Sequence, residues 1–233
     1  MLASVDRYVV LSEAGPLDAI VQLPRVLPDM SEDDHARYLV AMVAALGRRR
    51  SDEAETAIFK LDCWHALALP LFRRAFPDVS WIFLYREPVE VMVSHLRQRG
   101  VQTVPGLLDP GIFGIEAGPD MRSETYCVQV LDKICAAVIA HFGLGGGLLV
   151  NYDALPDALI AAILPHFGLE TLASEQDAMR AATQRDSKRP TETFSNDRMA
   201  KQRAANEAVR AAVEQGLASR YATLEQLRQE VRE

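Results

Sequence analysis

WIFLYREPVEVMVSHLRQRG, residues 81–100, is the part of the sequence that indicates the fold most clearly. It opens on an apolar run of the kind found in strands that are buried on both faces of a parallel sheet. Pro88 suits the first turn of a helix, and Gly100 suits a left-handed residue just after the helix end. We therefore expect strand, turn and helix, with Arg86 at the carboxyl end of the strand, where open α/β sheets bind ligands.

Further apolar runs, separated by helical patterns, predict more parallel strands. The runs lie at 8–12, 57–61 and 147–152. Ser31 is placed to cap a helix that ends near the basic residues 48–50, and the prolines and glycines of 101–119 predict a long surface loop. We expect an α/β fold with a mostly parallel central sheet flanked by helices, in one domain over residues 1–233.

The composition narrows the class of protein. With 25 basic and 32 acidic residues the formal charge is -7, which argues against a protein that coats nucleic acid. Cys63, Cys127 and Cys135 lack CxxC spacing and the histidines lack ligand spacing, so neither a disulfide framework nor a metal site is expected. No secretory leader and no run of about 18 apolar residues is present, so we expect a cytoplasmic protein without a membrane span.

Arg86 and Ser94 are the first candidates for a ligand site. A guanidinium at a strand end forms a charged fork that matches phosphate, and a hydroxyl two helical turns later can meet the same group. The pattern Y-R-x-P-x-x-x-x-x-S, formed by Tyr85, Arg86, Pro88 and Ser94, resembles the 3′-phosphate-binding motif of the sulfotransferase family. The alternative is a surface or helix-capping arginine beside an ordinary helical serine.

The resemblance implies a P-loop NTPase-like fold of the sulfotransferase type. It also implies that Arg86 and Ser94 bind the 3′-phosphate of 3′-phosphoadenosine 5′-phosphosulfate (PAPS), the sulfuryl donor. Lys188 and Arg189 match the basic loop that the family closes over this phosphate. The competing interpretation of Lys188 and Arg189 is a solvated pair of charges.

The segment AIFKLDCWHALALP, residues 57–70, is similar to the family's K-x-H-x-x-x-x-P pattern, with Asp62 in place of the histidine. The resemblance implies that Lys60 stabilises the leaving phosphate and that Asp62 or His65 acts as the base. Glu13, at the end of the first predicted strand, matches a glutamate that some branches of the family use as the base. Solvated surface roles for these four residues remain open.

The family's first strand and its glycine- and serine-rich phosphosulfate loop have no counterpart before Tyr8. The sequence leaves open an internal start site and a true truncation. The resemblance implies an enzyme that transfers a sulfuryl group from PAPS to a hydroxyl of a small molecule or glycan. The alternative is a non-catalytic remnant that binds 3′-phosphoadenosine nucleotides or acts in assembly, with a homo-oligomer left open. A small-molecule kinase is less favoured, because no Walker lysine is present.

Overall fold

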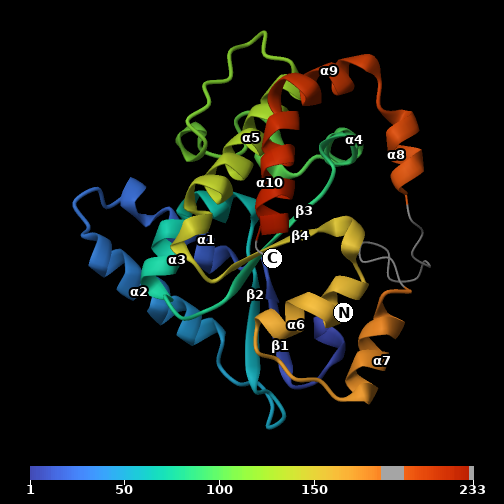
Figure 1. Ribbon diagram of the computed structural model, residues 1–233. Coiled ribbons are helices and arrows are strands. Elements are labelled where there is room, and N and C mark those ends of the chain that lie inside the picture. Colours follow the sequence, from blue (N-terminus) through green and yellow to red (C-terminus); the bar gives the residue numbers. More distant parts are fainter. Residues whose placement is uncertain (185–196, 231–233) are drawn as a thin grey trace. The chain divides into compact units, whose positions relative to one another are not determined.

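The computed structural model describes residues 1–184 and 197–230 (Figure 1). These residues divide into two compact units. Unit 1 comprises residues 1–81 and 156–184, and unit 2 comprises residues 82–155 and 197–230. Each unit has its own buried residues, and each is described by itself.

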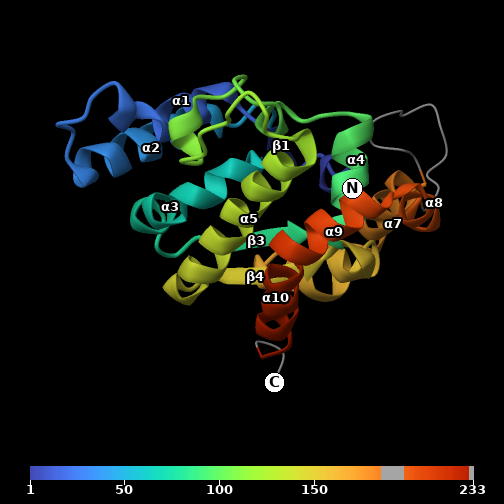
Figure 2. The same cartoon turned by 90° about the horizontal axis from the view of Figure 1, so that it is seen from above.

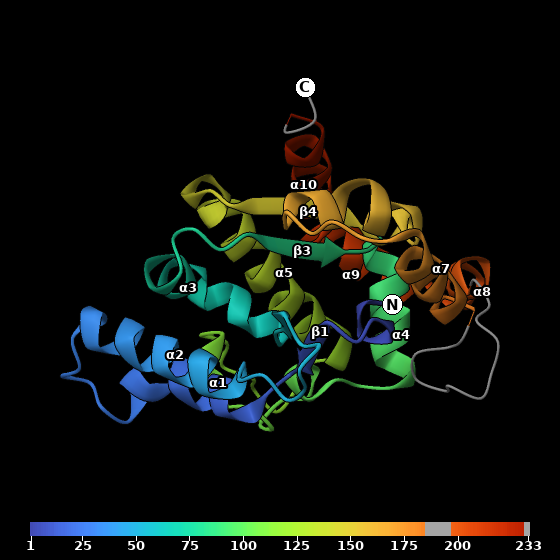
Figure 3. The ribbon, with the colours of Figure 1, turned by 90° about the horizontal axis from the view of Figure 1, so that it is seen from below.

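The four described strands pair two by two. Strand β1 (Tyr8–Ser12) runs parallel to β2 (Thr56–Lys60), in a register that begins at Tyr8 and Thr56 and ends at Ser12 and Lys60. Strand β3 (Trp81–Tyr85) pairs with β4 (Gly147–Asn151), and this sheet is parallel too (Figure 3). The α/β class and the parallel pairing are thus confirmed, but the strands form two small sheets where one central sheet was expected.

In the sequence, the helices of unit 1 lie between β1 and β2 or after β2. They are α1 (Gly15–Val21), α2 (Glu32–Leu46), α3 (Leu69–Ala75), α6 (Leu164–His166) and α7 (Ala173–Ala182). Short 3₁₀ turns lie at Leu2–Ser4, Leu23–Arg25 and Cys63–Ala68, and a π-helical turn lies at Leu159–Ile163. The cap predicted for α2 is confirmed, because the Ser31 hydroxyl accepts a hydrogen bond from the Asp34 amide at 3.1 Å. Figure 3 shows α1 and α2 side by side.

The helices of unit 2 enclose an apolar core. They are α4 (Pro88–Arg97), α5 (Ser123–His141), α8 (Arg198–Ala204), α9 (Glu207–Gly216) and α10 (Ala218–Glu230). Short 3₁₀ turns lie at Val101–Thr103, Pro110–Ile112, Phe142–Leu144 and Tyr152–Ala154. The core joins α4, α5 and α9 through Val89, Met92, Val93, Cys127, Val128, Val209, Val213 and Leu217. Figure 2 shows α5 beside α9 and α10.

Two local predictions were wrong. Helix α4 ends at Arg97, and Gly100 has a φ of -73°, so it is not the left-handed residue expected after the helix. The segment 101–119 is not a bare surface loop, since it forms two 3₁₀ turns and buries Thr103, Phe113 and Ile115. Apolar side chains scattered among prolines and glycines gave no helical or strand period, so the sequence pattern hid their burial.

One described helix is long and apolar enough, by length and composition, to cross a membrane. It covers Ser123–Leu144, with a mean hydropathy of 1.5. Its buried residues include Val130, Ile134 and Val138, and α4, α9 and α10 contact α5. A core helix passes the same test, so this helix is weak support for a membrane span.

Candidate functional site

Glu13 and Lys60 meet at the carboxyl end of the parallel pair in unit 1. The Glu13 amide donates a hydrogen bond to the Lys60 carbonyl at 2.7 Å, and the Lys60 ammonium pairs with the Glu13 carboxylate. Glu13 has a φ of 50°, and among the described residues no other non-glycine has a positive φ. A side chain held in the left-handed region costs conformational energy, and such residues gather at functional sites. The register of β1 and β2 thus brings two predicted site residues together.

Asp62 lies two residues beyond the end of β2 and is half-buried. No described residue donates a hydrogen bond to its carboxylate. Burial raises the pKa of Asp62, and this effect outweighs the attraction of His65 and Lys60. The nearby carboxylates of Glu13 and Asp18 raise the pKa further. A raised pKa and unused oxygens suit a group that takes up a proton.

His65 is enclosed, and its partner is a residue that the sequence analysis missed. The His65 side chain is 1% exposed, and its Nε2 lies 3.0 Å from Oδ1 of Asp18. Trp64 Nε1 donates to the same oxygen at 2.7 Å. His65 Nδ1 is buried and has no hydrogen-bond partner among the described residues, which favours the tautomer with the proton on Nε2. His65 therefore positions Asp18, which is the more exposed of the two.

The strand, turn and helix around Arg86 fold as expected within unit 2. Tyr85 ends β3, Pro88 begins α4, and the Glu87 carboxylate accepts a hydrogen bond from the Glu90 amide at 3.1 Å. This bond satisfies one of the open amides of the first helical turn. The Arg86 guanidinium lies over the ring of Tyr152, 4.6 Å from its centre, and this contact limits the orientation of the side chain.

Two carboxylates hold the Arg86 side chain. Its Nε donates to Glu90 Oε2 at 2.6 Å, and its Nη2 donates to Asp197 Oδ1 at 3.1 Å. Burial alone would lower the pKa of Arg86, but these two hydrogen bonds outweigh it and raise the pKa. Nη1 has no hydrogen bond to any described residue. Arg86 is thus fully charged and keeps one donor group that no described residue uses.

Two more cations complete this ion-pair network. Arg198 Nε lies 3.2 Å from Glu90 Oε1, Arg198 Nη1 donates to Asp153 Oδ2 at 2.6 Å, and the Lys201 ammonium lies 2.9 Å from Asp197 Oδ2. We call this set the Arg86 cluster: Arg86, Arg198, Lys201, Glu90, Asp153 and Asp197. Among the described residues, three positive charges of the cluster face three negative charges.

Ser94 lies one helical turn after Glu90, on the same face of α4. It is half-buried, and its hydroxyl makes no hydrogen bond to any described residue. Ser94 thus lies in the helix that follows Arg86. Lys188 and Arg189 lie outside the described residues.

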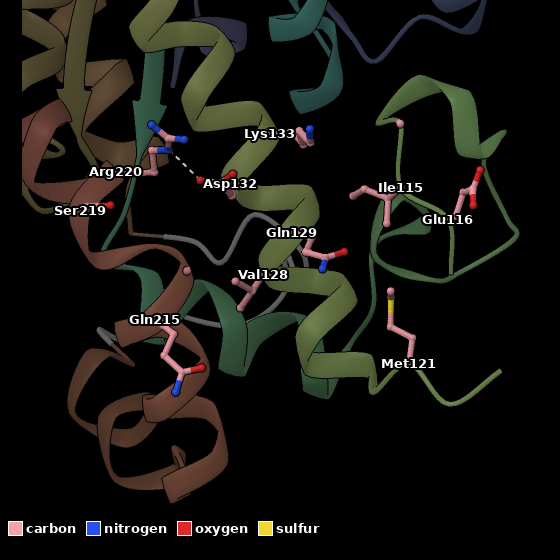
Figure 4. Close-up of a pocket in the computed structure, with 12 residues that line it drawn as sticks. Ile115, Glu116, Met121, Val128, Gln129, Asp132, Lys133, Gln215, Ser219 and Arg220 are labelled. Atoms are coloured by element: carbon pink, nitrogen blue, oxygen red, sulfur yellow. Dashed lines mark hydrogen bonds and ion pairs between the residues drawn. The ribbon is translucent and has the colours of Figure 1, made fainter. Parts of the chain in front are cut away.

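Unit 2 also has a hollow that the residues of the Arg86 cluster do not line (Figure 4). It measures about 620 Å³ and lies between the segment 114–121, α5 and the α9–α10 corner, where Arg220 pairs with Asp132 at 2.7 Å. Its walls include the exposed side chains of Gln129, Lys133 and Gln215. None of the predicted site residues lines it. Solvated walls of both charge signs indicate no ligand class.

In the described part of the chain, no group of three or more His, Cys, Asp or Glu side chains could hold a metal ion. Comparison of this chain with protein-family models and with curated proteins found no match. The functional conclusions therefore rest on the residues themselves.

Proposed function

We propose that this chain is a sulfotransferase-type protein, with a P-loop-like α/β fold, that transfers a sulfuryl group from PAPS to a hydroxyl acceptor. The observation that carries the proposal is the meeting of Glu13, Lys60 and Asp62 around the carboxyl ends of β1 and β2. The resemblance to the family assigns these same residues to the chemistry. A carboxylate with a raised pKa beside a lysine and a strained glutamate is the kind of arrangement that proton transfer requires.

The reaction needs a base and a positive charge. The acceptor oxygen forms a bond to sulfur, the bond from sulfur to the 5′-phosphate oxygen breaks, and the acceptor proton passes to a carboxylate. Asp62 is the better base, because its oxygens have no described hydrogen-bond donor, whereas Glu13 is engaged by Lys60. The Lys60 ammonium is exposed and supplies the charge that stabilises the leaving phosphate.

Recognition of the donor substrate is assigned to unit 2. Its 3′-phosphate fits the Nη1 donors of Arg86, which no described residue uses, and the Ser94 hydroxyl is likewise uncommitted. The fit is partial, because Glu90 and Asp197 already balance the guanidinium charge. A phosphate would therefore have to compete with a carboxylate of the protein.

That same balance favours a second candidate, a non-catalytic protein. If the Arg86 cluster only stabilises unit 2, the resemblance reflects descent from an enzyme whose nucleotide site is no longer used. The two functions differ in whether the chain distinguishes nucleotides that carry a 3′-phosphate.

Isothermal titration with 3′,5′-adenosine bisphosphate and adenosine 5′-phosphate makes this distinction. For the enzyme, the bisphosphate binds the wild type more tightly, and Arg86→Lys weakens it by about tenfold or more, because an ammonium keeps the charge but loses the fork. Arg74→Lys is the matched control, since Arg74 forms an exposed ion pair with Glu32 in unit 1. Equal binding of the two nucleotides by the wild type contradicts the enzyme and supports the non-catalytic protein.

Transfer itself is measured with labelled PAPS and a panel of phenol, sterol, sugar and tyrosyl peptide acceptors. Asp62→Asn should lose transfer while keeping the affinity for 3′,5′-adenosine bisphosphate. A wild type that binds the bisphosphate selectively but labels no acceptor would contradict the transfer reaction and support a non-catalytic protein that binds 3′-phosphoadenosine nucleotides.

A further inference from the structure

The Arg86 cluster contains one carboxylate that can be exchanged for a ligand. We propose that Asp197 is an internal competitor, whose carboxylate occupies the position where Arg86 and Lys201 would hold a tetrahedral oxyanion such as a phosphate or sulfate group. The inference rests on the proposed function in one respect, the identity of the natural ligand as a 3′-phosphate. The anion site itself follows from the contacts of the cluster.

Asp197 bridges two cations. Its Oδ1 accepts a hydrogen bond from Arg86 Nη2 at 3.1 Å, and its Oδ2 lies 2.9 Å from the Lys201 ammonium. Burial alone would raise the pKa of Asp197, but the hydrogen bonds from Lys201 and Arg86 outweigh it and lower the pKa. An oxyanion with two oxygens on these donors would meet the same charge-assisted bonds. The place now taken by the carboxylate is therefore chemically a phosphate or sulfate position.

The two carboxylates on Arg86 differ in their exposure. The Glu90 side chain is 0% exposed, whereas the Asp197 side chain is 44% exposed. Glu90 cannot leave without an uncompensated buried charge, but Asp197 can turn into water. Tyr152 lies against the guanidinium and limits its movement when Asp197 leaves. Asp197 is thus the exchangeable partner, and Glu90 is the fixed one.

The charge balance predicts what happens without Asp197. Its removal leaves three cations and two carboxylates in the cluster. One of the cations, Lys201, is only 7% exposed, and among the described residues it forms an ion pair with Asp197 alone. A buried ammonium without a counter-ion is unfavourable, so the cluster would take up an anion from solution.

The test uses inorganic phosphate and inorganic sulfate on the whole chain, at constant ionic strength set with chloride. Asp197→Asn keeps the size of the side chain and removes its charge, and no helix cap is lost, because the Asp197 side chain makes no cap hydrogen bond. We expect Asp197→Asn to bind phosphate about tenfold more tightly than the wild type in a calorimetric titration. We also expect its melting temperature to rise with phosphate by more than that of the wild type.

Asp177→Asn is the matched control, because Asp177 forms an exposed ion pair with Arg180 on α7. Its response to phosphate should equal that of the wild type. Equal phosphate affinity in the wild type and in Asp197→Asn overturns the proposal. If Asp197→Asn does not fold, Lys201→Met decides, since it keeps the apolar stem but removes a donor. It should bind phosphate at least about threefold more weakly than the wild type, and unchanged affinity overturns the proposal.

The same variants separate this inference from the proposed function. Tighter binding of inorganic phosphate by Asp197→Asn, without any preference for 3′,5′-adenosine bisphosphate over adenosine 5′-phosphate, supports the anion site and contradicts the 3′-phosphate as ligand. If the wild type and Asp197→Asn have the same affinity for the bisphosphate and the same affinity for inorganic phosphate, and both still prefer the bisphosphate to adenosine 5′-phosphate, only the internal competitor is contradicted.

Discussion

Replacement of Glu90 by glutamine tests whether the Arg86 cluster supports unit 2. Glu90 is 0% exposed and contacts Arg86 at 2.6 Å and Arg198 at 3.2 Å. Glutamine has nearly the same shape, so packing is preserved while the negative charge is lost. Because Arg86 is only 17% exposed, its charge then lacks its buried counter-ion, and breaking a buried pair in this way costs about 3 to 5 kcal/mol.

Glutamine keeps one oxygen as an acceptor, and Asp197 remains beside Arg86, so we expect the lower end, about 3 kcal/mol. For a chain of this size 1 kcal/mol corresponds to about 2 to 4 °C in melting temperature, which gives a fall of about 6 to 12 °C. Thermal unfolding followed by circular dichroism measures it, with urea titration as the independent check on the free energy of unfolding.

The matched control is Glu32→Gln. Glu32 also lies in the first turn of a helix and pairs with an arginine, Arg74, but its side chain is 83% exposed. An exposed pair contributes at most about 1 kcal/mol, so this variant should melt within about 3 °C of the wild type. Equal losses for Glu90→Gln and Glu32→Gln would refute the argument that burial of the pair sets its contribution.

Three further predictions concern the turn before β4, acid stability and the proposed base. Gly145 has a φ of 82°, whereas Gly143 does not lie in the left-handed region. Gly145→Ala should therefore lower the free energy of unfolding by about 1 to 3 kcal/mol, while Gly143→Ala should change it little or raise it. Urea unfolding measures both effects. Burial raises the pKa of Asp197, but the hydrogen bonds from Lys201 and Arg86 outweigh it and hold the pKa below the ordinary value of an aspartate. Its stabilising contribution is therefore complete above that ordinary value and is lost as the pH falls through the lowered one, so Asp197→Asn should flatten this acid limb of stability. Because the pKa of Asp62 is raised, the acidic limb of the pH profile of transfer in the wild type should reflect Asp62, and transfer that persists in Asp62→Asn with an unchanged acidic limb would exclude Asp62 as the base.

The Arg86 cluster also explains why a motif alone does not establish a ligand. A free guanidinium after a strand attracts phosphate, but Arg86 is balanced by Glu90 and Asp197. Only a ligand that displaces Asp197, or that meets the Nη1 group that no described residue uses, gains from this residue. The affinity for a phosphate therefore depends on residues that the motif does not contain.

The amino-acid sequence is enough to predict the local elements. Apolar runs place the four strands within one or two residues of where the structure has them, since burial on both faces requires continuous apolar side chains. Ser31 and Pro88 mark helix starts, because a cap and a missing N–H act within one turn. Glu90 was also within reach of the sequence, because its spacing of four from Arg86 is a known pairing distance.

Which side chains of these elements pair with one another depends on the tertiary structure. Asp197 is 111 residues from Arg86, and Asp18 is 47 residues from His65, so no local rule could pair them. The burial of His65 likewise depends on which side chains pack around it. The same holds for Asp62, to whose carboxylate no described residue donates a hydrogen bond. The charge balance and the pKa of a group depend on its neighbours in space, and these are fixed only when the chain folds into its two compact units.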